Sequence, residues 1–218
     1  MKNVEIIKQS ILFKGIEHHN LDSILACLSA RVNLYKQGEF VFHAGGSVSF
    51  VGIVISGKAV EIKEDEEGNR IIISEIMPGG LFAEAYACAG AVQSDISVQA
   101  ATESKIMILD YKKVITVCST ACVFHTKLIE NMLEILANKV LMMNHKLEIV
   151  SKRTIREKLM SFFERQKSMA NSNKFAIPFN REQLADFLFV DRSALSRELS
   201  RMQDEGLIKY KKNMFEIY

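Results

Sequence analysis

The sequence contains few cysteines and no long apolar segment. Its 218 residues hold four cysteines, Cys27, Cys88, Cys118 and Cys122, which are too sparse for a disulfide framework. No two of them form a CxxC pair, which argues against a zinc ribbon. No run of 18 apolar residues is present, and the first ten residues, MKNVEIIKQS, lack the apolar core of a secretion signal. We therefore expect a cytoplasmic protein with reduced thiols and no membrane partner.

Charge is distributed unevenly along the chain, although the formal net charge is only +2. From Ser151 onward, 14 Lys and Arg residues stand against 9 Asp and Glu residues. The first 150 residues carry 14 basic against 17 acidic residues. A basic C-terminal third that follows an acidic body predicts a polyanion-binding module attached to a second domain.

The region from about residue 31 to 110 has the pattern of a β-protein. Two short amphipathic helices are expected before it, within residues 2–30. Apolar strand-like runs within 40–42, 51–55, 71–73 and 106–109 are separated by turn signals, among them Gly45-Gly46 and Pro78-Gly79-Gly80. Many short strands with glycine turns predict a β-sandwich or barrel rather than a parallel sheet.

A long helix is expected after this β-region, because no glycine occurs between residue 91 and Gly206. Apolar residues in it alternate spacings of four and three, as in a coiled coil. These residues are Ile129, Leu133, Leu136, Val140, Met143, Leu147 and Val150. A second stripe, Leu128, Met132, Ile135 and Met142, lies beside the first. We interpret the second stripe as packing on the β-domain and the first as a homodimer interface; a core helix serving one domain is the alternative.

The C-terminal third predicts a pair of helices joined by a short turn. We expect a helix from a cap at Ser151 to about Gln166, then a polar loop at 168–174. Asn180 is the expected cap of the next helix, 181–188, and a second helix follows at about 192–205. Core-spaced Leu195, Leu199 and Met202 leave Arg192, Ser193, Ser196 and Arg197 on the opposite face. This is a helix-turn-helix pattern, whose second helix presents side chains to base edges in the major groove.

Two local features complete this pattern. Residues 207–211 and 214–218 flank Lys212-Asn213 and predict a basic hairpin wing that contacts phosphates. Phe189 stands where such turns usually carry a glycine with positive φ. Either that conformation costs about 1–2 kcal/mol, or the turn adopts another one. A generic helical pair with solvated charges is the alternative to DNA binding.

Taken together, the order of β-barrel, long helix and winged helix-turn-helix resembles the Crp/Fnr family of bacterial transcription regulators. The resemblance covers essentially the whole chain, and its most specific segments are PGGLFAEAYACAG and DRSALSRELSRM. It implies an α+β fold with a sensory β-roll of the jelly-roll, cyclic-nucleotide-binding type. The expected domains are residues 1–118 for the β-roll, 119–150 for a dimerisation helix and 151–218 for a winged DNA-binding domain.

The resemblance also assigns the DNA contacts. Arg192 and Arg197 match base-reading arginines of the family, and Asn180 with Arg181 matches a phosphate contact. Ser193 replaces a glutamate of the cAMP-binding members, so base preference should differ at that position. Ser196 is the remaining residue of the expected DNA-binding set.

The sensory site departs from the family pattern. A cyclic-nucleotide site needs a glutamate for the ribose and an arginine that pairs with the cyclic phosphate. Glu84 matches the glutamate, but Ser94, followed by Asp95, occupies the arginine position. A hydroxyl and a carboxylate do not replace guanidinium, so the sequence argues against cAMP. Candidate effector-pocket residues are Phe82, Glu84, Cys88, Ser94, Asp95, Lys139 and Val140.

Lys139 interrupts the second apolar stripe of the long helix. We hypothesise that it pairs with Glu84 or holds a small anionic effector; a lysine that extends along the helix to solvent is the alternative.

The sequence was also searched for residues that could bind the other cofactors of this family, an iron–sulfur cluster and haem. No cysteine occurs in residues 1–26, which argues against an N-terminal iron–sulfur cluster. Cys118 and Cys122 near the start of the long helix are candidate redox sensors, or small buried apolar residues. Haem stays open, because five histidines and ten methionines supply possible ligands although no CxxCH occurs. The cofactor therefore stays unknown, and no metal site is expected.

The sequence thus favours a homodimeric regulator that binds a double-stranded DNA operator, with RNA polymerase and a small-molecule effector as further partners. A ligand-sensing regulatory module without DNA binding is the alternative. Cupin enzymes share the jelly-roll barrel but need closely spaced metal ligands, whereas residues 31–110 hold only His43 and no HxH. No Walker loop and no Ser/His/Asp arrangement is visible, and we expect no enzyme.

Overall fold

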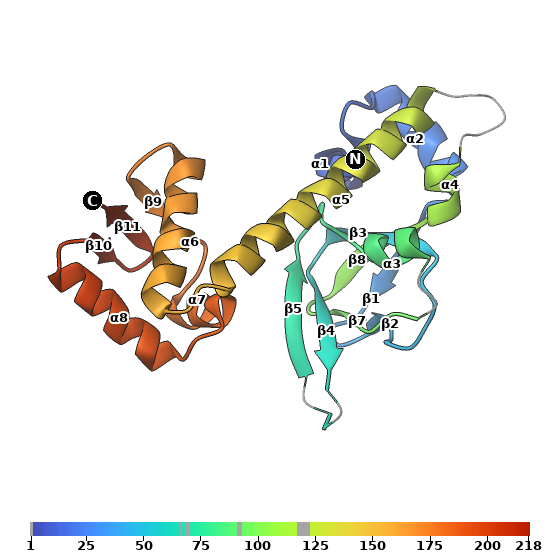
Figure 1. Cartoon of the computed structure of the whole chain (residues 1–218). Coiled ribbons are helices and arrows are strands. Elements are labelled where there is room, and N and C mark those ends of the chain that lie inside the picture. The colour runs from blue at the N-terminus through green and yellow to red at the C-terminus, as the bar shows by residue number, and fades with distance from the viewer. Residues whose placement is uncertain (1, 66, 69, 91–92, 117–122) are drawn as a thin grey trace. The chain divides into compact units, whose positions relative to one another are not determined.

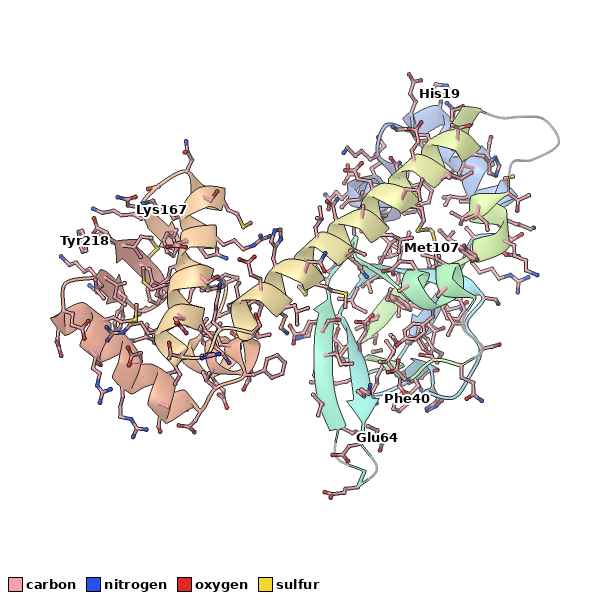
Figure 2. All side chains as sticks on the ribbon, viewed as in Figure 1. His19, Phe40, Glu64, Met107, Lys167 and Tyr218 are labelled. Atoms are coloured by element: carbon pink, nitrogen blue, oxygen red, sulfur yellow. The ribbon has the colours of Figure 1, made fainter. Side chains whose placement is uncertain are left out.

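The computed structural model describes residues 2–65, 67–68, 70–90, 93–116 and 123–218 (Figure 1). The chain divides into two compact units, Met1–Ala137 and Asn138–Tyr218. The 28-residue helix α5 (Val123–Val150) contributes to both units. Figure 2 shows the side chains on this framework, with Met107 labelled in the first unit and Lys167 and Tyr218 in the second.

The first unit combines two antiparallel sheets with short helices. Its helices besides α5 are α1 (Lys2–Gln9), the 3₁₀ helix η1 (Ile11–Phe13), α2 (His18–Cys27), α3 (Glu84–Ala89) and α4 (Tyr111–Ile115). Its strands are β1 (Arg31–Tyr35), β2 (Phe40–Phe42), β3 (Phe50–Ser56), β4 (Ala59–Glu64), β5 (Arg70–Ile76), β6 (Leu81–Phe82), β7 (Ser97–Ala100) and β8 (Ser104–Asp110). The strand orders are β1-β8-β3-β6 and β2-β7-β4-β5, and the neighbouring strands run antiparallel.

A core lies between the two sheets. Val54, Phe82 and Ile106 of the first sheet and Ala59 and Val98 of the second belong to one buried cluster. The predicted β-roll is therefore confirmed, and the expected runs at 40–42, 51–55, 71–73 and 106–109 all lie within strands.

The helices pack on the other face of the first sheet. Because successive side chains of a strand point to opposite faces, Val51, Ile53 and Ile55 of β3 join a second core with α1, α2 and α5. From α5 this core takes Leu128, Met132 and Ile135, each at most 6% exposed. These three residues are the second apolar stripe predicted from the sequence, and they pack on the β-domain as expected. Met142, the fourth member of that stripe, is 67% exposed.

A buried amide ties the N-terminal segment to α5. Asn131 is 1% exposed, and its Nδ2 donates hydrogen bonds to the carbonyl oxygens of Leu12 and Lys14 at 2.9 and 2.8 Å. Lys14 also pairs with Glu134, one turn further along the helix, at 2.9 Å. The link fixes the position of the chain between α1 and α2 along α5.

The second unit holds α6 (Ile155–Ala170), β9 (Lys174–Ala176), α7 (Arg181–Leu188), α8 (Arg192–Asp204), β10 (Ile208–Lys211) and β11 (Met214–Ile217). The three strands form one antiparallel sheet in the order β10-β11-β9. A single apolar core joins all three helices to this sheet and includes Ile149 near the end of α5. The predicted winged helix-turn-helix is confirmed. Strand β9 is a third strand that was not predicted; its first residue, Lys174, ends the expected polar loop.

The expected cap of α6 at Ser151 is wrong. The Ser151 hydroxyl donates to the carbonyl of Glu148 at 2.9 Å, at the end of α5. Thr154 caps α6 instead, through a capping box in which its Oγ1 accepts from the Glu157 amide and Glu157 accepts from the Thr154 amide. The helix also continues past Gln166 to Ala170, where Asn171 ends it in the left-handed conformation at φ 47°.

Among the residues that the structure describes, no helix is both long and apolar enough to cross a membrane.

Gly52 should be essential for packing of the β-roll. A Cβ at this position would lie 2.1 Å from Cζ of Phe82, which is fully buried. We expect Gly52→Ala to lower the free energy of unfolding by about 1–3 kcal/mol, because the core must expand around the added methyl group. Thermal unfolding measures the effect. Gly46→Ala is the control, since its Cβ meets only the His43 carbonyl at 3.3 Å; equal losses in both variants would contradict the packing.

Candidate nucleic-acid interface and sensory site

The first helix of the helix-turn-helix begins at a well-defined cap. Asn180 Oδ1 accepts from the Gln183 amide and Gln183 Oε1 accepts from the Asn180 amide, both at 2.9 Å. This reciprocal pair satisfies backbone amides that the first turn of α7 leaves without helical partners. The predicted cap at Asn180 is confirmed, and it places Arg181 at the first position of α7.

The turn between α7 and α8 contains a strained residue. Phe189 has φ 52° and ψ 57°, the left-handed conformation that a glycine adopts without cost. Its amide donates to the Asp186 carbonyl and the Val190 amide donates to the Ala185 carbonyl, which closes the helix end. Of the two alternatives that the sequence left open, the structure has the strained one, at a cost of about 1–2 kcal/mol. The ring is nevertheless 69% exposed.

Asp191 caps α8, a role that the sequence analysis did not assign. Its Oδ1 accepts from the Ser193 hydroxyl at 2.5 Å and from the Ala194 amide at 2.9 Å. These two hydrogen bonds hold the pKa of the Asp191 carboxyl below its usual value. A sequence signal was available, since Asp is among the strongest N-cap residues. The cap keeps the Ser193 hydroxyl turned toward its own helix terminus.

The exposed face of α8 carries the predicted DNA-binding residues. Leu195, Leu199 and Met202 have no exposed area and fix the inner face of α8. Arg192 and Arg197 are exposed in its N-terminal half. The Ser196 hydroxyl donates to the Arg192 carbonyl at 2.9 Å, so this serine stays close to the helix backbone. The two guanidinium groups are therefore the long polar groups on this part of the helix.

An arginine on α6 holds α8 in place, and the sequence analysis missed it. Arg156 Nε donates to Glu198 at 2.6 Å, and its two terminal nitrogens donate to both oxygens of Glu205 at 2.7 and 2.8 Å. A planar guanidinium can bind two carboxylates in this way because its donors form a rigid fork. Glu198 lies at the middle of α8, directly after Arg197 in the sequence, and Glu205 is the residue at which the helix ends.

Arg181 joins α7 to the wing. Its guanidinium carbon lies 4.7 Å from the ring centroid of Tyr210 and 5.1 Å from that of Phe215, and Nη2 donates to the Lys212 carbonyl at 3.2 Å. Burial lowers its pKa somewhat from the usual value. Arg181 and Lys212 also line an open groove of ≈ 540 Å³ between the start of α7 and the tip of the wing. The expected phosphate contact is thus half-buried and held by aromatic rings.

The candidate sensory residues belong to two different cores. Phe82 is fully buried between the two sheets, whereas Cys88 packs at the edge of the core beneath the helices. Glu84 begins α3 and is 1% exposed. The residue before it, Ala83, has φ 67°, a left-handed conformation in which a non-glycine residue is strained. Strain of this kind is often found at ligand sites.

Ser94 and Asp95 differ in environment. Ser94 is buried, and its hydroxyl bonds the backbone of Ile96. Asp95 accepts hydrogen bonds from Lys63, at 2.7 Å, and from the Tyr86 hydroxyl. Lys63 and Tyr86 lower the pKa of the Asp95 carboxyl, while burial and Asp95 raise the pKa of Tyr86 to about 12. The carboxylate is therefore matched by Lys63, a cation that the sequence analysis did not consider.

The other two candidates for the effector pocket, Lys139 and Val140, are exposed residues of α5 that belong to the second unit, and their proposed role stays a prediction. Cys118 and Cys122 fall outside the described residues, so their proposed redox role stays a prediction. A different thiol contact was missed: Cys27 Sγ of α2 lies 3.7 Å from Nε2 of His125, which is 2% exposed on α5. Within the described ranges, no three His, Cys, Asp or Glu side chains are grouped so as to hold a metal ion.

Comparison with known proteins agrees with this architecture. Residues 32–121 match the cyclic nucleotide-binding domain, and residues 157–218 match the Crp-like helix-turn-helix domain. The chain belongs to the Crp/Fnr family of transcription regulators. As a Crp/Fnr protein it is a DNA-binding transcription regulator, and the matched helix-turn-helix domain contains α7, α8 and the wing.

Solved structures of similar fold include other regulators. The catabolite activator protein of Thermus thermophilus has a TM-score of 0.55 and 20% identity, over 96% of this chain and 94% of its own. The c-di-GMP-responsive regulator CLP of Xanthomonas campestris has a TM-score of 0.61 and 14% identity, over 93% and 99%. FixK2 of Bradyrhizobium japonicum has a TM-score of 0.52 and 16% identity, over 86% and 92%. A search of curated protein sequences found no match.

The two described thiols of this Crp/Fnr protein should differ in reactivity. Burial raises the pKa of the Cys88 thiol, so less thiolate is present at pH 7 and alkylation is slow. Cys27 is exposed. We expect iodoacetamide to label Cys27 at least about tenfold faster than Cys88, as followed by peptide mass spectrometry. The urea-unfolded chain, in which both should react alike, is the control; faster labelling of Cys88 in the folded chain would contradict its environment.

Proposed function

We propose that the chain acts as a homodimer that binds a pseudo-palindromic DNA operator through α8, under the control of an effector other than cAMP. The observation that carries the proposal is the exposed N-terminal half of α8, which presents Arg192 and Arg197 on a helix fixed by an apolar core and by Arg156. A precisely held helix is what base recognition in a major groove requires.

Base recognition is assigned to the two arginines. An Arg guanidinium can donate two hydrogen bonds to O6 and N7 of guanine, the commonest specific contact in the major groove. Ser193 and Ser196 direct their hydroxyls to Asp191 and to the backbone, which leaves room for bases to approach. We infer that the serines contribute close contact to the DNA and the arginines contribute sequence preference.

Phosphate binding is assigned to the groove beside the wing. Arg181, Lys212 and Asn180 line it, and Asn180 is the residue that caps the N-terminus of α7. A DNA phosphate bound here would be contacted by positive charge and by a helix N-terminus. Because Arg181 is held by Tyr210 and Phe215, binding at this site requires little ordering of its side chain.

Dimerisation is assigned to the first apolar stripe of α5. Leu133, Val140, Met143 and Leu147 are 62%, 55%, 71% and 65% exposed. Ile129, Leu136 and Val150 of the same stripe are half-buried. Leu128, Met132 and Ile135 of the second stripe already pack on the β-roll, so a second copy of α5 is the partner that matches the heptad-like spacing of the first stripe.

The residues at the expected phosphate position argue against cAMP as the effector. Ser94 is buried and bonded to its own loop, and Asp95 is paired with Lys63, so neither residue supplies the guanidinium that pairs with a cyclic phosphate. Another small molecule is therefore proposed as the signal. We further propose that the protein works in the cytoplasm, contacts RNA polymerase and catalyses no reaction. The alternative of a sensing module without DNA binding is not favoured, because the helix-turn-helix is complete.

Operator selection from a random pool of DNA duplexes tests the proposal. We expect an enriched pseudo-palindrome with half-site centres about 34–36 Å apart and guanines in each half. Arg197→Ala should weaken binding by about 1–3 kcal/mol and relax the preference at one position. Arg181→Ala should weaken all sequences alike and reduce the salt dependence.

The control is Arg165→Ala, an arginine of α6 outside the proposed interface. Selection is run with reductant and without, and again with cell extract to supply an effector. Failure to enrich any two-fold-symmetric sequence under all of these conditions would refute the proposal.

A charge in the first stripe of α5 should prevent association. Met143→Glu would place a carboxylate at a coiled-coil contact position, where it cannot be buried without large cost. We expect the variant to sediment as a monomer at concentrations where the native chain is a dimer. Met169→Glu is a matched control, because Met169 on α6 is equally exposed, at 71%. If the Met143→Glu variant still forms a dimer, the dimer interface is not the first stripe of α5.

A further inference from the structure

A lysine near the end of α5 contacts the turn of the helix-turn-helix. Lys146 Nζ lies 5.1 Å from the ring centroid of Phe187 and 5.1 Å from that of Phe189. Phe187 is in the last turn of α7, and Phe189 is the left-handed residue between α7 and α8. At these distances an ammonium group is attracted to the faces of both aromatic rings.

The end of α5 is also part of the core of the DNA-binding unit. Ile149 is 3% exposed and belongs to the same cluster as Leu184 and Leu188 of α7. Figure 1 shows the end of α5 beside α7 in the second unit. The last turns of α5 and the helix-turn-helix therefore form one packed body, with Ile149 as the apolar contact and Lys146 as the polar one.

Packing alone does not account for Phe189. Its ring is 69% exposed, and its backbone occupies a conformation that glycine adopts without strain. This conformation costs stability for a large aromatic residue, and a favourable contact of the side chain can offset part of that cost. The contact that the structure shows is the one with Lys146. An observed strained residue with a specific partner indicates a functional constraint.

We propose that Lys146 and Phe189 are positioning residues that fix the orientation of α8 relative to α5, and thereby set the half-site spacing that the dimer accepts. The inference rests on the proposed homodimer. In a dimer joined along α5, the angle between the end of α5 and the reading turn determines how far apart the two α8 helices lie. A loose junction would allow several separations, whereas a fixed one allows a single separation.

Spacing is a sensitive measure of this angle. One added base pair moves a half-site by about 3.4 Å along the DNA and by about a tenth of a turn around it. A rigid dimer loses contacts with such a site, but a dimer with a loose junction can follow it. A change in stability alone weakens binding to all spacings together and leaves their ratio unchanged.

The experiment uses the full-length chain and duplexes that carry two selected half-sites with centre spacings from two base pairs shorter to two base pairs longer. The variants are Lys146→Met, which removes the charge and keeps the length, and Phe189→Leu, which removes the ring and keeps a non-glycine residue. We expect the native chain to prefer one spacing by about tenfold or more over its neighbours. In both variants this ratio should fall to about threefold or less, because the contact that fixes the angle is gone.

Two controls separate positioning from folding. Lys167→Met removes an exposed lysine of α6 in the same unit and should keep the native spacing ratio. Binding to a single half-site should be nearly the same in all variants, which shows that α8 itself is intact. If one variant does not fold, as judged by thermal unfolding, the other one decides the test.

The outcomes are distinguishable. Native spacing ratios in Lys146→Met and Phe189→Leu would overturn the inference and leave the proposed function in place. If the native chain binds no two-fold-symmetric site at all, the proposed function fails and the inference fails with it.

Discussion

Burial of one stripe of α5 against the first sheet is the constraint on which the rest of the molecule depends. Leu128, Met132 and Ile135 pack on β3 and β8 together with α1 and α2, and this contact decides which face of the helix points into the β-roll. The remaining apolar stripe is then left on the outside, where its spacing suits a second helix. One helix thereby serves as a core element of the sensory unit, as the proposed dimer contact and, through Ile149, as a core element of the DNA-binding unit.

Much of the fold could be predicted from the sequence, because the buried face of a helix or strand requires apolar residues at regular spacings. The alternating strands, the two stripes of α5 and the cap at Asn180 all follow from local spacing. Ser151 shows the limit of such reasoning, since both Ser151 and Thr154 are good cap residues. The choice between them depends on where α5 ends, and the Ser151 hydroxyl is used there. The exact start of α6 is therefore set by the preceding helix and not by its own residues.

The parts of the site that could not be predicted are contacts between residues distant in sequence. Arg156 binds Glu198 and Glu205, and Asp95 is matched by Lys63; neither pair has a local signature. The helix pattern indicated Arg192 and Arg197, and resemblance to the family indicated Glu84. The same resemblance led to Asp95 being considered only as a residue that does not replace an arginine. The contact between Cys27 and His125 lay outside every motif. Such pairings depend on tertiary packing, which single-sequence patterns do not contain.

The buried amide of Asn131 has a consequence for how α5 can move. Its nitrogen donates to two carbonyl groups, those of Leu12 and Lys14, from a position that water does not reach. Sliding the helix by a fraction of a turn would break both hydrogen bonds and leave the buried Asn131 amide and the buried Leu12 carbonyl without these partners. Intermediate positions of α5, in which these groups are unpaired but still away from water, are therefore less stable than the observed position. They are also less stable than a released position in which water can reach the groups. Motion of α5 against the β-roll should therefore occur in discrete steps and not as a continuous drift.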